Sequence, residues 1–192
     1  MSRAQGRRAL PGFVSVLAFV VAFCASALAW AEPAMRVEAT ARQADGRILF
    51  AGQAGTTAEG WPRVLIGRLN ADGTMDATFA NGGLASFDTG TSNSLRATAI
   101  APMPDGQVLV GLLYADNYPG LLRLDAAGVV QGSGLGPLGY GIAVDNYGFS
   151  FEMNALFVQP GGTIIAAGGL ANGGGTYAAL VRYDAMGQRD LA

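Results

Sequence analysis

The chain of 192 residues contains no lysine and no histidine, and its only cysteine is Cys24. Without histidine the protein has no imidazole general base, no histidine metal ligand and no histidine pH switch. Because Cys24 lies in the N-terminal leader described below, the remainder of the chain has no thiol nucleophile, disulfide or thiolate metal site. Most residue types that enzymes use for catalysis are therefore missing, and we expect neither a metal site nor a cofactor.

Charged residues are also few, at 14%, whereas 51% of the residues are hydrophobic, which is the composition of a folded protein. All fourteen acids lie from Glu32 onward, and three of the twelve arginines precede it. Nine arginines against fourteen acids give residues 32–192 a net charge of −5. Such a domain has no basic field to concentrate phosphate groups, so we expect no nucleic-acid partner.

The N-terminus has the three-part order of a secretory signal peptide. Residues 1–8 carry three arginines and no acid, Phe13–Leu28 is almost wholly apolar, and Ala29 and Ala31 are the small residues that a signal peptidase inspects. We predict a signal peptide over residues 1–31, cleavage before Glu32, and a secreted or periplasmic location. The alternative is an uncleaved membrane anchor, because the apolar run approaches the roughly 17–25 residues that span a bilayer.

Two short phrases recur in register along the rest of the chain. The first is a tight turn followed by an apolar run that ends near glycine, and it occurs as QADGRILFAG (Gln43–Gly52), MPDGQVLVGL (Met103–Leu112) and QPGGTIIAAG (Gln159–Gly168). The second occurs as IGRLNADG from Ile66, LLRLDAAG from Leu121 and LVRYDAMG from Leu180. Three copies of two phrases indicate internal repeats.

The repeats predict an all-β fold of four-stranded antiparallel blades, forming a partial β-propeller-like array of about three. The expected units are residues 35–92, 93–150 and 151–192, the last without its fourth strand. The copies of the first phrase are spaced by 60 and 56 residues, a period typical of propeller blades with four strands. The run Ile48–Ala51 is apolar on both faces, which predicts a sheet packed between other sheets. Loops are expected at 53–62, 114–119 and 169–175, and an insertion at 146–152.

The paired phrases resemble the bacterial delta-60 repeat. The closest matches are Met103–Val110 and Arg68–Gly73, and the Asp-x-x-Phe phrase follows the second of them at Asp76–Phe79. The resemblance implies a propeller-like exported protein, and it carries no general catalytic motif. Because propellers typically have 4–8 blades, three units imply either an incomplete or degenerate array or a ring closed by a second copy.

The repeated acids have a structural interpretation. Asp45, Asp72 and Asp105 each precede a glycine, and an aspartate in a turn binds its own backbone. Recurrence in every unit favours this role over catalysis or cation binding. The spacing Asn70, Asp72, Asp76 is similar to a calcium loop but lacks the final bidentate acid of an EF-hand.

Two further sets of residues are candidates for recognition. The repeated Arg68, Arg123 and Arg182 either line a central channel or pair with an acid of a neighbouring blade. The unrepeated polar and aromatic residues that connect second and third strands should emerge at one edge, where they are either a binding face or solvated connectors. This loop face comprises Trp61, Tyr114, Asp116, Asn117, Tyr118, Asn172 and Tyr177.

These observations predict an exported, non-enzymatic repeat module with a binding or structural role at the cell envelope. Its expected partner is an envelope protein, a glycan or a second copy of itself. One alternative is a hydrolase that cleaves a glycan with carboxylates alone, using Asp145 and Glu152, or Asp116 and Glu59. The other is a truncated, non-functional fragment of a longer propeller.

Overall fold

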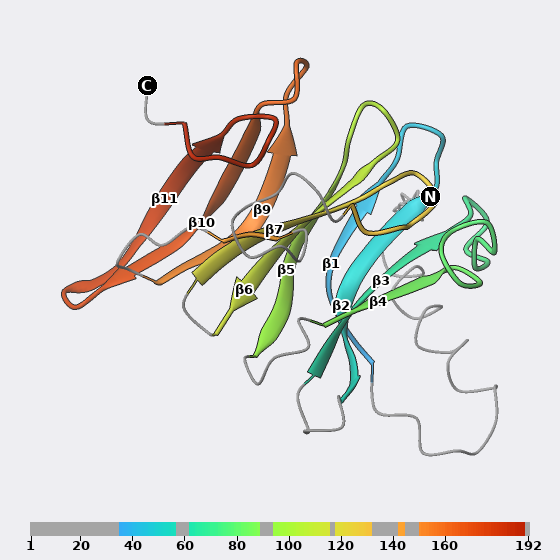
Figure 1. The fold of residues 1–192 in the computed structure, drawn as a ribbon, viewed down its shortest axis with the longest axis horizontal. Coiled ribbons are helices and arrows are strands. Elements are labelled where there is room, and N and C mark those ends of the chain that lie inside the picture. The colour runs from blue at the N-terminus through green and yellow to red at the C-terminus, as the bar shows by residue number, and fades with distance from the viewer. Residues whose placement is uncertain are drawn as a thin grey trace, which may run out of the picture. The chain divides into compact units, whose positions relative to one another are not determined.

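The structure is a computed structural model, and it describes residues 35–56, 62–88, 94–115, 118–131, 142–144 and 150–190. All of these belong to the unit Glu32–Ala192. The predicted signal peptide and its cleavage site lie outside the described residues. Every element of the described part is a β-strand, which confirms the all-β prediction (Figure 1). No helix within these ranges is long and apolar enough to cross a membrane.

The strands form three antiparallel sheets that follow one another along the chain (Figure 1). Sheet A has the order β1-β2-β3-β4, sheet B the order β5-β6-β7-β8, and sheet C the order β11-β10-β9. Sheet A comprises β1 (Arg36–Arg42), β2 (Ile48–Thr56), β3 (Pro62–Leu69) and β4 (Leu84–Phe87). Sheet B comprises β5 (Leu95–Pro102), β6 (Val108–Tyr114), β7 (Tyr118–Leu124) and β8 (Ile142–Val144). Sheet C comprises β9 (Ser150–Val158), β10 (Ile164–Asn172) and β11 (Gly175–Tyr183).

The first two strands of each sheet are joined by the predicted glycine turn. Gly46, Gly106 and Gly162 have φ angles of +89°, +81° and +89°, a region that residues with a side chain rarely adopt. Each of the three amides donates to the carbonyl three residues earlier, at 3.0 Å. The repeated turn therefore sets the start of every sheet, as the sequence predicts.

Sheet B is packed between the other two sheets. Val108, Val110 and Leu112 of β6 belong to the apolar cluster shared with sheet A. Leu109, between them in sequence, belongs to the cluster shared with sheet C. Successive side chains of a strand point to opposite faces, so the unbroken apolar run of β6 fills two cores at once.

The connections between second and third strands are shorter than predicted. Tyr114 ends β6 and Tyr118 begins β7, so only 115–117 connect these strands. The loop expected at 169–175 is largely strand, since β10 continues to Asn172. β2 likewise continues to Thr56 and β3 begins at Pro62, so 53–56 are strand rather than loop. The expected insertion at 146–152 is also partly strand, because β9 begins at Ser150.

Close backbone approach explains why the strand continues past Gly168, the residue directly before the expected loop. A Cβ at Gly168 would overlap the carbonyl oxygen of Glu152 on the neighbouring strand. The register of β9 and β10 shifts between Ala167 and Gly168, which marks a β-bulge. The glycine is required by this bulge inside the sheet and does not end the strand.

Candidate functional site

The predicted loop face is described only in part. Trp61, Asp116 and Asn117 lie outside the described residues. Tyr114 and Tyr118 are paired across the ends of β6 and β7, on either side of the short turn. Both are partly exposed, so two phenol rings flank this connection.

The corresponding hairpin of sheet C carries the other two predicted residues. Asn172 ends β10, and its side-chain oxygen accepts a hydrogen bond of 3.1 Å from the amide of Gly174. Tyr177 pairs with Leu170 near the same end and is 53% exposed. Asn172 therefore has a role in shaping the turn, whereas the ring of Tyr177 is available to solvent.

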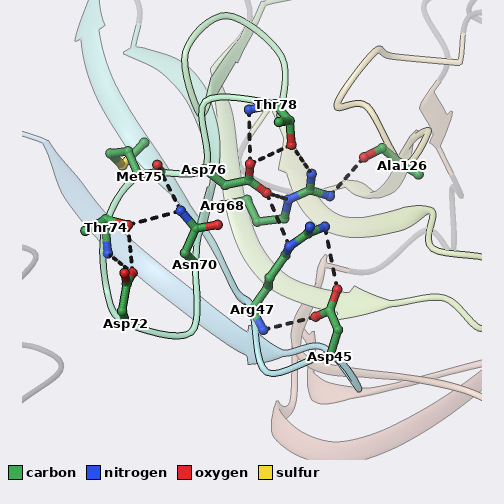
Figure 2. Close-up of polar contacts among 10 residues, drawn as sticks. All are labelled: Asp45, Arg47, Arg68, Asn70, Asp72, Thr74, Met75, Asp76, Thr78 and Ala126. Atoms are coloured by element: carbon green, nitrogen blue, oxygen red, sulfur yellow. Dashed lines mark hydrogen bonds and ion pairs between the residues drawn. The ribbon is translucent and has the colours of Figure 1, made fainter.

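The most developed polar site is a buried cluster around Arg68 of β3 (Figure 2). Its Nε donates to Asp76 Oδ2 at 2.7 Å, and its Nη2 donates to Thr78 Oγ1 at 3.4 Å. Asp76 Oδ1 in turn accepts from the amide and the hydroxyl of Thr78, at 3.0 and 2.6 Å. The side chains of Arg68 and Asp76 are only 5% and 4% exposed. The pair is thus hydrogen-bonded on both sides, which a buried ion pair requires.

A second cation and an aromatic ring complete this cluster. Arg47 Nε lies 3.5 Å from Asp76 Oδ2, so one carboxylate faces two guanidinium groups. The guanidinium carbon of Arg68 lies 4.7 Å from the centroid of the Phe79 ring, within cation–π range. The hydrogen bond from the Thr78 hydroxyl does most to lower the pKa of Asp76, and the Thr78 amide and Arg68 lower it further. Together they outweigh burial, which raises the pKa, and the pKa falls to about 2.

The cluster also joins sheet A to sheet B. Arg68 Nη1 donates to the carbonyl of Ala126, at the turn that follows β7, at 2.9 Å (Figure 2). The amide of Ala80 donates to the carbonyl of Ala127 at 2.6 Å. A Cβ on Gly128 would lie 2.9 Å from Ala80, so the turn fits closely against the segment after Asp76.

The same arginine contact recurs between sheets B and C. Arg123 occupies the position of Arg68, and its Nη2 donates to the carbonyl of Ala185 at 2.6 Å. The position of Asp76 is taken by Gln131, whose amide group donates instead to Asp125. Arg123 Nε consequently has no hydrogen-bond partner among the described residues.

These contacts correct the prediction for the repeated arginines. The sequence offered a channel lining or an acid of a neighbouring blade as their partner. Arg68 instead pairs with Asp76, eight residues later in its own unit, and the neighbouring sheet supplies a backbone carbonyl. In sheet C, Arg182 likewise pairs with its own Asp190, at 2.9 Å. Asp76 and Thr78 were missed as a site, although the Asp-x-Thr-Phe phrase that contains them was recognised.

Two segments match a known family model. Residues 43–79 and 159–192 match a domain of unknown function, DUF5122, described as a beta-propeller. Both segments run from the first hairpin turn through the arginine and acid, eight residues apart, that pair in each of these units. The chain is thus similar to a beta-propeller repeat family. No curated protein matches the sequence.

The blades of this propeller-like array use their repeated aspartates to build turns. The carboxylates of Asp45, Asp72 and Asp105 accept from the amide two residues later, at 3.0, 2.9 and 3.1 Å. Hydrogen bonds from Thr74 also lower the pKa of Asp72. Asp72 and Asp76, the acids of the calcium-like spacing, bind different partners. Within the described ranges no three carboxylates, cysteines or histidines gather as metal ligands would.

The carboxylates of the hydrolase hypothesis are not brought together by any described contact. Glu152 lies in β9, and its Oε1 accepts from Arg96 Nη2 of β5 at 2.9 Å, which links two blades. Asp145, Asp116 and Glu59 lie outside the described residues. The described geometry therefore assigns Glu152 a structural contact.

Proposed function

We propose that the chain is an exported, non-enzymatic module of three delta-60-type repeats, with a binding role at the cell envelope. The observation that supports the proposal is that polar residues within the repeated phrases and aromatic residues outside them make different contacts. Repeated polar groups, such as Asp45, Arg68 and Arg123, are engaged in turns and contacts between blades. Aromatic groups outside the two repeated phrases, such as Tyr177, are exposed at the ends of the hairpins. Recognition on rigid scaffolds usually resides in such variable connections.

Export is supported by the leader sequence, and it has a direct test. The intact mass of the chain recovered from the envelope fraction should correspond to a polypeptide that begins at Glu32. An Ala31→Arg variant should keep the leader, because the peptidase requires a small residue at that position. A chain recovered from the envelope with residues 1–31 attached would contradict cleavage and favour the anchor.

Binding through the loop face is supported by the chemistry of its residues. Phenol rings present a flat apolar face and a hydrogen-bonding tip, and amides add polar contacts, a combination that suits a glycan. We expect purified protein to bind polysaccharide or peptidoglycan prepared from the cell envelope. Replacing Tyr118 and Tyr177 together with serine should weaken this binding at least about tenfold, as loss of two anchors would.

Val129 provides the matched control for this experiment. It is 57% exposed, is apolar, and lies in the turn after β7, at the opposite end of that strand from Tyr118. Val129→Ser should leave glycan binding unchanged. Equal loss in both variants, or no binding by the parent protein, would contradict a glycan-binding loop face.

The hydrolase alternative is tested on the same material. We expect no release of reducing sugar from these polysaccharides by the parent protein. Activity that is present in the parent and abolished by Asp145→Ala with Glu152→Ala would support carboxylate catalysis instead.

A further inference from the structure

The contact between neighbouring blades joins an arginine to a backbone carbonyl, and among the described residues one arginine has no such carbonyl and one such carbonyl has no arginine. Arg68 donates to the carbonyl of Ala126, and Arg123 donates to the carbonyl of Ala185. The third arginine, Arg182, pairs with Asp190, and no described carbonyl accepts from it. The corresponding third carbonyl is that of Ala71, and no described arginine donates to it.

The sheet face that carries Arg182 is apolar and exposed. Leu180 is 76% exposed, whereas Ile66 and Leu121, which precede Arg68 and Arg123 by the same two residues, are both 0% exposed. Phe157 of β9 and Arg182 of β11 both pair with Ile165 of the strand between them. Phe157 is 62% exposed. Sheet C therefore presents the face that in sheets A and B is covered by the next blade.

Sheet A has the complementary features. Val108 and Ile164 begin β6 and β10, face the preceding blade and are 0% exposed, while Ile48 at the start of β2 is only partly buried. A Cβ on Gly73 would meet nothing within 4 Å, although the equivalent Gly128 fits against the preceding blade. Sheet A therefore has a turn and an apolar edge of the kind that sheets B and C insert into a neighbour.

We propose that sheet C of one chain binds sheet A of a second copy, with Arg182 donating to the carbonyl of the partner's Ala71. The contact repeats the A–B and B–C packing between two molecules. It joins unlike surfaces, so two copies close a ring when each contributes both surfaces. This interface is independent of glycan binding through the hairpin ends.

The first test is the solution mass of the full chain, as recovered from the producing cells, by sedimentation equilibrium. We expect at least two copies per particle at micromolar concentration. Leu180→Arg should reduce the particle to one copy, because it places a charge in an apolar contact. Val129→Arg introduces the same charge at an apolar residue that is 57% exposed and lies outside this face, and it should leave the mass unchanged. Arg182→Gln should weaken association roughly 10–100-fold, the range for a hydrogen bond to a charged group.

A mixing experiment distinguishes this arrangement from association of two identical faces. Leu180→Arg removes the sheet C surface, and Ile48→Arg removes the sheet A surface. Each variant alone should be monomeric, and a mixture should form a one-to-one complex through the remaining pair of surfaces. A circular dichroism spectrum like that of the parent identifies folded variants. A monomeric parent protein, or folded variants that do not associate on mixing, would overturn the proposal.

Discussion

Asp76→Asn should be one of the most destabilising isosteric changes in this chain. Asp76 Oδ2 lies 2.7 Å from Arg68 Nε and 3.5 Å from Arg47 Nε. Without the carboxylate charge, both guanidinium groups lose this counter-charge, and the Arg68 side chain is only 5% exposed. Removing one partner of a buried ion pair typically destabilises by about 3–5 kcal/mol. We expect a loss in that range, against a total stability of about 5–15 kcal/mol for a domain.

Urea unfolding, followed by circular dichroism, measures this loss. With a dependence on urea of about 1–3 kcal/mol per molar, the midpoint should fall by at least about 1 M. Both variants are made in the Leu180→Arg background, so that association between copies does not bury the second pair. Asp190→Asn is then the matched control, because Arg182 and Asp190 have the same spacing but side chains 46% and 33% exposed. An exposed pair contributes about 0–1 kcal/mol, so its midpoint should hardly move.

The double variant Arg68→Met with Asp76→Leu separates the pair's net contribution from the effect of an unpaired charge. Apolar replacement of both members of a buried pair is often neutral or stabilising, so most of the loss should be recovered. If Asp76→Asn and Asp190→Asn shift the midpoint equally, the buried cluster does not hold the first two blades as described.

Two further predictions follow from the same cluster and the turn that it contacts. The folded-state pKa of Asp76 is lowered from 3.8 to about 2. The contribution of Asp76 to the unfolding free energy should therefore be complete above about pH 5 and should disappear as the pH falls through 2. The difference in unfolding free energy between the parent and Asp76→Asn should shrink over that interval. Gly128→Ala and Gly73→Ala place a side chain at φ angles of +83° and +86°, and we compare them in the Leu180→Arg background, in which the Gly73 turn stays uncovered. Thermal melts should show the larger loss, by about 1–3 kcal/mol, for Gly128, whose Cβ alone would contact Ala80.

Much of the fold could be predicted from the sequence because its signals are local. An aspartate or glycine before Gly46, Gly106 and Gly162 specifies a positive φ wherever the turn occurs. The apolar run Ile48–Ala51 similarly predicts a sheet packed between other sheets, and the equivalent run of β6 contributes to two apolar clusters. These features depend on a few neighbouring residues, so no knowledge of the remote chain was needed.

Features that depend on strand pairing were predicted less well. A loop was expected directly after Gly168, since a glycine at a bulge cannot be distinguished by composition from a glycine in a turn. The acid that pairs with Arg68 was sought in another blade because the sequence does not show that the chain returns after the turn at Gly73. That return pairs Leu69 with Met75 and places Asp76 beside Arg68.

The glutamine at position 131 makes the two joints between neighbouring blades unequal. Arg68 holds its neighbour from within a neutralised cluster, whereas Arg123 reaches Ala185 with no carboxylate at its Nε. At these two contacts, a thermal fluctuation should therefore release the carbonyl of Ala185 more readily than that of Ala126. An amide at Gln131, where the first unit has the carboxylate of Asp76, thus makes the arginine contact between sheets B and C the weaker of the two.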